Sequence, residues 1–180
     1  MNKYNVTADE IVALLGRSET DDKILDLFEK LEIDRSEIES DEDDDTFNIE
    51  LEEDIGLGLT FNGSLNEKYC IPKYIGGNYF VDCLFTYEFK PLPFGLNDEY
   101  NLEKVIEILG REPNFRLAND KTACEWIYED LGDLIIEFED ETLSSIYEVR
   151  VLVYDNPDFS SEDFQDASIP FKKKEKKENE

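Results

Sequence analysis

The sequence predicts an α+β fold in which helices pack on one face of an antiparallel sheet of about six strands. Two observations predict it. Segments with apolar residues at helical spacing end in Leu-Gly-Arg at "EIVALLGR" (10–17) and again at "EKVIEILGR" (103–111). Behind each follow segments in which apolar and polar residues alternate, the period of a half-buried strand. We therefore expect two similar halves, each a helical segment followed by a three-strand meander.

Two short helices are predicted near the N-terminal end. Thr7 and Glu10 have the spacing of a capping box, which marks the start of the first helix. Gly16 suits the left-handed position that ends it. The second helix is expected within residues 20–33, where Asp21 and its neighbours supply an N-cap and apolar residues recur at helical spacing.

Three strands are predicted to follow, at "FNIEL" (47–51), "IGLGLTF" (55–61) and "NYFVDCLFTYEF" (78–89). The dipeptide Asn62-Gly63 is typical of a hairpin turn. Strict alternation along the third strand assigns residues to two faces. We expect one face to hold Tyr79, Val81, Cys83, Phe85 and Tyr87, and the other to hold Phe80 and Leu84.

The second half begins after a linker, "KPLPFGLND", that two prolines and a glycine keep irregular. A helix is expected over about 98–109, with Gly110 as its C-cap and Pro113 preventing its continuation. Three strands are then predicted, at "CEWIYED", "DLIIEFED" and "SIYEVRVLVYD".

The chain is accordingly expected to form one compact domain with two parts and a tail. Residues 1–90 hold the N-terminal helical segment and the first meander, and residues 91–156 hold the second helix and meander. Residues 157–180 end in "KKKEKKENE". Their mixed charge and scattered Ser, Asp and Pro are typical of a flexible tail.

The charge balance restricts the partners. The chain has 46 acidic and 18 basic residues, a formal net charge of −28. Such a charge repels nucleic acid and anionic membranes, so we expect neither as a partner and expect a basic protein instead. The plainer alternative is an acidic surface that serves only solubility or adaptation to salt.

Histidine is absent from the sequence, and the three cysteines (Cys70, Cys83 and Cys124) show no CxxC spacing. Ser-His-Asp and Cys-His nucleophiles and most catalytic zinc sites are therefore excluded, and we expect no enzyme, no metal and no cofactor. Reduced cysteines, with no recognisable signal peptide, indicate a cytoplasmic protein. One set of carboxylates resembles acid–base pairs but is expected on the solvent face of strands: Glu129, Asp130, Glu137, Glu139 and Asp140.

The phrase "LPFGL…YNLEKVIEILGREP" carries a family resemblance. It resembles the helix-to-meander motif of the β-lactamase inhibitory protein and SmpA-like families, in which a G-x-x-x-x-x-V-x-x-x-L-G-x-P phrase introduces a small antiparallel sheet. The comparable positions are Gly95, Val105, Leu109, Gly110 and Pro113. The resemblance implies duplicated helix–meander units.

The first 150 residues or so also resemble small acidic bacterial immunity proteins, which protect a cell from its own secreted polymorphic toxin. The features that carry this resemblance are "LLGRSETDDKILDLFEKL" and the joint "PLPFGL". It implies an inhibitor that binds and neutralises a cognate toxin, one acting on nucleic acid, through an acidic surface. Two alternatives remain open, a nucleic-acid mimic that regulates a basic host protein and a general protein-interaction module.

The candidate partner-binding residues are acidic groups in two regions. The segment "ESDEDDD" is the densest, and it departs from the D-x-[DN]-x-[DN]-G pattern of a calcium loop. The candidates are Asp41, Glu42, Asp43, Asp44, Asp45, Glu129, Asp130 and Glu139. Trp126 and Tyr128 share a strand face, and burial in the core is expected over a role as a binding platform.

Overall fold

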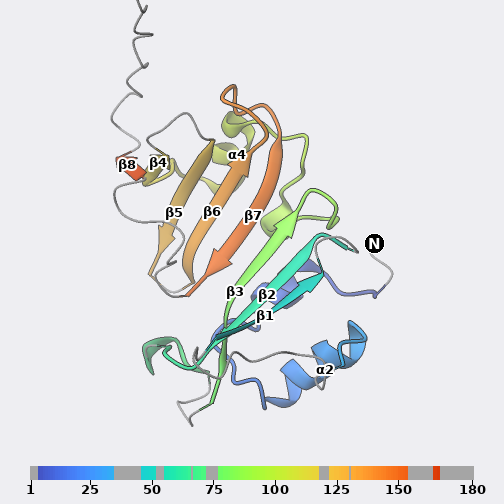
Figure 1. Ribbon diagram of the computed structural model, residues 1–180. Coiled ribbons are helices and arrows are strands. Elements are labelled where there is room, and N and C mark those ends of the chain that lie inside the picture. Colours follow the sequence, from blue (N-terminus) through green and yellow to red (C-terminus); the bar gives the residue numbers. More distant parts are fainter. Residues whose placement is uncertain are drawn as a thin grey trace, which may run out of the picture.

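The computed structural model has an α+β fold built on one antiparallel sheet, as the sequence predicts (Figure 1). The described residues are 4–34, 46–51, 55–65, 67–71, 77–117, 122–129, 131–153 and 164–166. Their helices are α1 (Ala8–Val12), α2 (Asp22–Lys30) and α4 (Leu102–Leu109), with 3-10 turns η2 (Glu67–Tyr69) and η3 (Pro93–Gly95). Their strands are β1 (Thr46–Leu51), β2 (Leu57–Asn62), β3 (Tyr79–Thr86), β4 (Phe115–Leu117), β5 (Ala123–Tyr128), β6 (Gly132–Phe138), β7 (Ile146–Leu152) and β8 (Phe164–Asp166).

Within the described residues the sheet has eight strands in the order β1-β2-β3-β7-β6-β5-β4-β8, where about six were predicted. Every neighbouring pair is antiparallel. The two strands beyond the prediction, β4 and β8, have three residues each, which is too short to show an alternating pattern. β8 lies within the C-terminal segment 157–180, for which the sequence indicates no strand.

One face of the sheet carries apolar side chains across its four central strands. Cys83, Val151, Leu134 and Trp126 are cross-strand neighbours on β3, β7, β6 and β5, and all are at most 1% exposed. A second row of the same face is formed in the same way by Phe85, Val149, Ile136 and Cys124. This face is the core face of the sheet.

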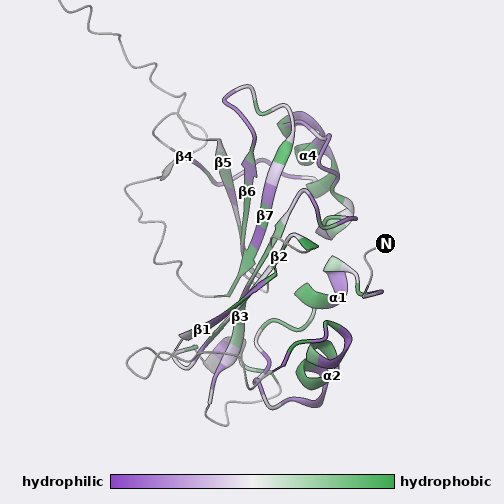
Figure 2. Ribbon diagram, turned by 45° about the vertical axis from the view of Figure 1, so that its right-hand side comes forward, coloured by the Kyte–Doolittle hydropathy of each residue, from purple (hydrophilic) through white to green (hydrophobic). Residues whose placement is uncertain are grey.

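The core face continues onto β2, where α2 packs against it. Phe28 of α2 meets Phe61 of β2 edge-on, with ring centroids 5.6 Å apart. Phe47 and Phe80 stack on the same Phe61 ring at 4.7 and 5.1 Å. In Figure 2, α4, α1 and α2 are drawn one above another to the right of the sheet. No helix among the described residues is long and apolar enough to cross a membrane.

The predicted starts of the two N-terminal helices are confirmed by their caps, whereas the helix expected from about residue 98 begins only at Leu102, with Asn101 as its N-cap. Thr7 and Glu10 form both hydrogen bonds of the capping box at the start of α1. The Asp21 carboxylate accepts from the Lys23 N–H at the start of α2. At the end of α4, Gly110 is the predicted left-handed C-cap, with φ +71°, and its N–H donates to the Ile106 carbonyl.

The prediction that Gly16 caps the first helix is wrong. α1 ends at Val12 and its C-cap is Ala13, so Gly16 lies beyond the helix. Gly16 still has a positive φ, +83°, but the reason is its contact with distant segments and not the end of a helix. The Gly16 N–H donates to the Phe80 carbonyl at 2.7 Å, and its carbonyl accepts from the Ile71 N–H at 2.9 Å. Gly16 therefore lets the chain pass directly against the start of β3.

The predicted faces of β3 are wrong at its first residues. Leu59 lies opposite Cys83 and Leu57 opposite Phe85, whereas Phe61 lies opposite Phe80. The register shifts between Thr60 and Phe61, so β3 carries an extra residue there. Because this bulge breaks the alternation, Phe80 joins Cys83 and Phe85 on the core face.

Candidate functional site

Most of the acidic site residues predicted from the sequence fall outside what the structure describes. These are Asp41, Glu42, Asp43, Asp44, Asp45 and Asp130. The remaining two, Glu129 and Glu139, are described, and both are exposed. Glu129 directly follows β5 and precedes β6, whereas Glu139 directly follows β6. The seven-residue strand β6 therefore separates them, by about 20 Å at the rise of an extended chain. They do not form one cluster.

Glu139 and its neighbour Asp140 stabilise the turn between β6 and β7. The Glu139 carboxylate accepts from the Ser145 hydroxyl at 2.7 Å. The Asp140 carboxylate accepts from the Thr142 hydroxyl at 2.6 Å and from the Thr142 N–H at 2.8 Å. These hydrogen bonds hold the pKa of Asp140 below its usual value, because they favour the charged form. Both carboxylates therefore have a structural role in this turn.

Trp126 is completely buried and belongs to the core, as expected. Its indole N–H donates to the Arg111 carbonyl at 3.1 Å. The Arg111 guanidinium lies 4.9 Å from the centroid of the Tyr128 ring and donates to the Ile127 carbonyl. Burial raises the pKa of the Tyr128 hydroxyl. This group fastens the end of α4 to β5, so it does not present a free aromatic platform.

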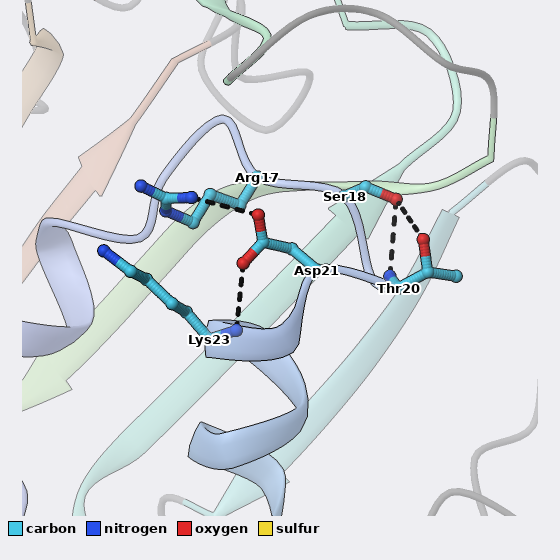
Figure 3. Close-up of polar contacts among 5 residues, drawn as sticks. All are labelled: Arg17, Ser18, Thr20, Asp21 and Lys23. Atoms are coloured by element: carbon cyan, nitrogen blue, oxygen red, sulfur yellow. Dashed lines mark hydrogen bonds and ion pairs between the residues drawn. The ribbon is translucent and has the colours of Figure 1, made fainter.

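The first Leu-Gly-Arg segment forms a second polar cluster, drawn in Figure 3. The Arg17 guanidinium pairs with the Asp21 carboxylate at 3.0 Å, and the other oxygen of Asp21 accepts from the Lys23 N–H at 2.9 Å. The hydroxyls of Ser18 and Thr20 lie 3.0 Å apart. These contacts join the chain after α1 to the first turn of α2, and they indicate a helix cap.

Two of the three buried cysteines, Cys83 and Cys124, offer no reactive thiol. Burial raises the pKa of the Cys124 thiol to about 11 and that of Cys83 well above its ordinary value. Both thiols are therefore protonated at neutral pH, and the thiolate is the nucleophilic form. Among the described residues, no three carboxylate or thiol side chains converge in a way that could hold a metal ion.

The structure does bring a different set of carboxylates onto one surface. On β3, β7, β6 and β5, the residues that alternate with the core face point to the opposite side of the sheet. Cross-strand neighbours define this side: Asp82 and Asp133 both lie opposite Leu152, Glu137 lies opposite Glu148, and Ile135 lies between Arg150 and Glu125. We call this surface the carboxylate face, with acidic residues Asp82, Glu125, Asp133, Glu137 and Glu148.

The carboxylate face has one basic residue on these four strands, Arg150. Its Nε donates to the Asp82 carboxylate at 2.7 Å, and its Nη2 forms an ion pair with the same oxygen. Asp82 is 2% exposed, so the pair joins β3 to β7 in a largely dry environment. The other four carboxylates are half-buried. On these four strands the carboxylate face thus has five acidic residues and one basic residue, and Lys68, outside the strands, interacts electrostatically with Asp133.

Sequence reasoning named only Glu137 among these five, and it assigned that residue correctly to an outward strand face. For Asp82, Asp133 and Glu148 the signal is present as alternation, because each directly precedes a residue of the core face. The strand order β3-β7-β6-β5 brings them together, and it is not visible in a local pattern.

We expect Glu137→Lys to raise the free energy of unfolding by roughly 0.5 kcal/mol, because like charges directly opposite each other destabilise an antiparallel pair. Glu137 and Glu148 are in that arrangement on β6 and β7. Urea unfolding of both proteins, followed by circular dichroism, measures the change. The control is Glu99→Lys at an exposed turn position outside the helices and strands, where no cross-strand carboxylate is relieved. A loss of stability in Glu137→Lys would contradict the repulsion.

No protein-family model, curated protein or solved structure matches the chain in the comparisons with known proteins.

Proposed function

We propose that the chain is an inhibitor of the immunity type, which binds a basic toxin domain and blocks it. The observation that carries the proposal is the carboxylate face, where five acidic side chains and one arginine share one side of four adjacent strands. A toxin that acts on nucleic acid needs a positive cleft to hold its substrate. A rigid negative surface complements such a cleft and speeds association by electrostatic steering.

The wider chain supports the same proposal through its charge. The formal net charge of −28 adds a long-range attraction for a basic partner to the local one of the carboxylate face. The acidic segment Asp41–Asp45 and the residues Glu129, Asp130 and Glu139 remain candidate contacts within this proposal. A cytoplasmic location and a function without cofactor or catalysis are further parts of it, since the inhibitor meets the toxin where its own cell is at risk.

The proposal is tested with a toxin domain encoded beside the gene for this chain. We expect the purified chain to abolish the activity of that domain. The association rate should fall steeply as NaCl rises from roughly 0.05 to 0.5 M, because screening shortens the reach of exposed charges to within about 10 Å. Stopped-flow mixing measures the rate. Absence of binding, or a rate that salt does not change, would refute the proposal.

The carboxylate face is tested by charge removal at constant size. We expect the variant with Glu125→Gln, Asp133→Asn and Glu137→Gln to associate several-fold more slowly at low salt, since rim charges act mainly on the association rate. The matched control replaces three helix carboxylates, with Asp26→Asn, Glu29→Gln and Glu103→Gln, and so has the same net charge. Equal slowing in the two variants would assign the effect to net charge alone.

We also infer that the two meanders are copies of one helix–meander unit with helices on a common face. The strand order supports this, because the third strands of the two meanders, β3 and β7, are neighbours in the sheet. Outward from this pair the order is β2, β1 on one side and β6, β5 on the other, so the two meanders lie in mirrored order. The two Leu-Gly-Arg segments attach differently, Arg17 to the start of β3 and Arg111 to the end of β5. The proposed duplication therefore concerns the strands more closely than the segments that precede them.

A further inference from the structure

Two tyrosines stand exposed at the junction between the two meanders. Tyr87 directly follows β3, and Tyr147 is the second residue of β7. Their side chains are 41% and 44% exposed. The ring centroids lie 6.0 Å apart with the planes tilted by 43°, and the Tyr87 N–H donates to the Tyr147 carbonyl at 3.0 Å. The sequence pattern placed Tyr87 within the third predicted strand, on the face of Val81 and Cys83, but β3 ends at Thr86 and Tyr87 lies beyond it.

This exposure differs from the ordinary scatter of apolar residues over a protein surface. Six large hydrophobic side chains are exposed among the described residues: Leu25, Ile71, Tyr87, Ile108, Ile127 and Tyr147. Within this group the aromatic members are the two tyrosines, and they contact each other. Tyrosine is also among the residues that dominate binding energy in protein interfaces, because it buries a large rigid ring and keeps a hydroxyl for hydrogen bonding.

The backbone under the first tyrosine is held firmly. The Thr86 N–H donates to the Gly56 carbonyl at 2.9 Å, and the Phe89 N–H donates to the Thr86 carbonyl at 3.0 Å. Gly56 packs so closely that an added Cβ would lie 2.4 Å from the Thr86 hydroxyl oxygen and 2.9 Å from the Phe89 nitrogen. Tyr87 therefore projects from a fixed turn.

The second tyrosine is equally restrained. Ile146, on one side of it, is completely buried, and its N–H donates to the Asp98 carbonyl at 2.7 Å. Glu148, on the other side, is paired with Thr86 across the β3–β7 ladder. A partner that binds the two rings thus meets a surface that is already ordered, which reduces the entropy lost on binding.

The charges around the pair favour a cation. Glu88 is exposed and follows Tyr87, while Glu148 follows Tyr147 and lies opposite Glu137 on the carboxylate face. The two basic residues nearest in sequence are each paired, Lys90 with the Asp98 carboxylate at 2.9 Å and Arg150 with the Asp82 carboxylate. Two adjacent aromatic rings, each followed in sequence by a glutamate, suit a guanidinium, which is planar, stacks on rings and forms paired hydrogen bonds with carboxylates.

We propose that Tyr87 and Tyr147 are the anchor of the partner interface and receive an arginine side chain of the basic partner. This inference rests on the proposed function and adds a location to it, at the junction between β3 and β7. The acidic surface attracts the partner, and the tyrosine pair fixes its position. The anchor therefore acts chiefly on the dissociation rate, whereas the surrounding carboxylates act on the association rate.

The test uses two defined peptides, acetyl-(Gly-Arg)4-amide and acetyl-(Gly-Lys)4-amide, titrated into the full ¹⁵N-labelled chain. We expect the arginine peptide to cause its largest amide shifts around Tyr87 and Tyr147 and to bind more tightly than the lysine peptide. Tyr87→Ala and Tyr147→Ala should each weaken arginine-peptide binding by about fivefold. Tyr87→Phe and Tyr147→Phe retain the ring and should bind as the wild type does.

Ile108→Ala on α4 is the matched control, because Ile108 is 40% exposed and lies away from the β3–β7 junction. Arginine-peptide affinity unchanged in both Tyr→Ala variants would overturn the anchor, as would shifts centred elsewhere or no binding at all. The proposed function is decided separately by whether the wild-type chain inhibits the toxin domain. If it does and the Tyr→Ala variants inhibit with unchanged dissociation rates, the anchor alone fails.

Discussion

Gly16→Ala is expected to lower the free energy of unfolding by about 3 kcal/mol, three times the loss of about 1 kcal/mol expected for Gly110→Ala. Both glycines have a positive φ, +83° and +71°, and alanine is strained there. The surroundings differ. A Cβ on Gly16 would lie 2.0 Å from the Tyr69 carbonyl oxygen, whereas a Cβ on Gly110 would meet no atom within 4 Å. Overpacking therefore adds to backbone strain at Gly16 alone.

The chain cannot easily withdraw at Gly16, because both its N–H and its carbonyl are hydrogen-bonded, to Phe80 and Ile71. Urea unfolding of the two alanine variants measures the difference, and far-UV circular dichroism checks that each retains the fold. Since both positions belong to Leu-Gly-Arg segments, each variant serves as the other's control. Similar losses in the two variants would show that the close approach at Gly16 relaxes without cost.

This pair of glycines illustrates what the sequence could predict and what it could not. A glycine after an apolar helical run predicts a left-handed residue, and the prediction holds at Gly110, where the cause is local. At Gly16 the positive φ is present, but the cause is the approach of residues 69–71 and 80, distant in sequence. The same holds for β3. Alternation predicted the strand, but the bulge in its pairing with β2 moved Phe80 to the core face.

For the candidate site, too, local features can be predicted from the sequence, whereas contacts between distant segments cannot. The sequence alone predicts a binding site in dense acidic runs such as Asp41–Asp45, because the density of charge can be read along the chain. The carboxylate face is assembled from single acidic residues on four strands, and its members are neighbours only because β7 lies between β3 and β6. The tyrosine pair depends on the β3–β7 contact in the same way. Local periodicity predicts that each strand carboxylate of this face points outward, and tertiary pairing decides which of them meet.

Arg150→Met is expected to lower the free energy of unfolding by about 3–5 kcal/mol, because it leaves a buried carboxylate without its arginine. Asp82 is 2% exposed, and two nitrogens of the Arg150 guanidinium bond to one oxygen of its carboxylate. Asp82→Val alone is expected to be costly for the matching reason, although less so, since the Arg150 side chain is 15% exposed and retains some water. Urea unfolding at neutral pH measures both variants.

The double variant Asp82→Val with Arg150→Met tests whether this ion pair contributes to the stability of the fold or to contact with a partner. An apolar pair of similar volume removes both desolvation costs, so we expect most of the stability lost in the single variants to return. Its net charge equals that of the wild type, because one acidic and one basic residue are removed together. Association with a basic partner should therefore keep its salt dependence. If the double variant loses the sum of the two single losses, the strands are joined by something other than the ion pair. If stability returns and the salt dependence disappears, Asp82 and Arg150 belong to the contact surface itself.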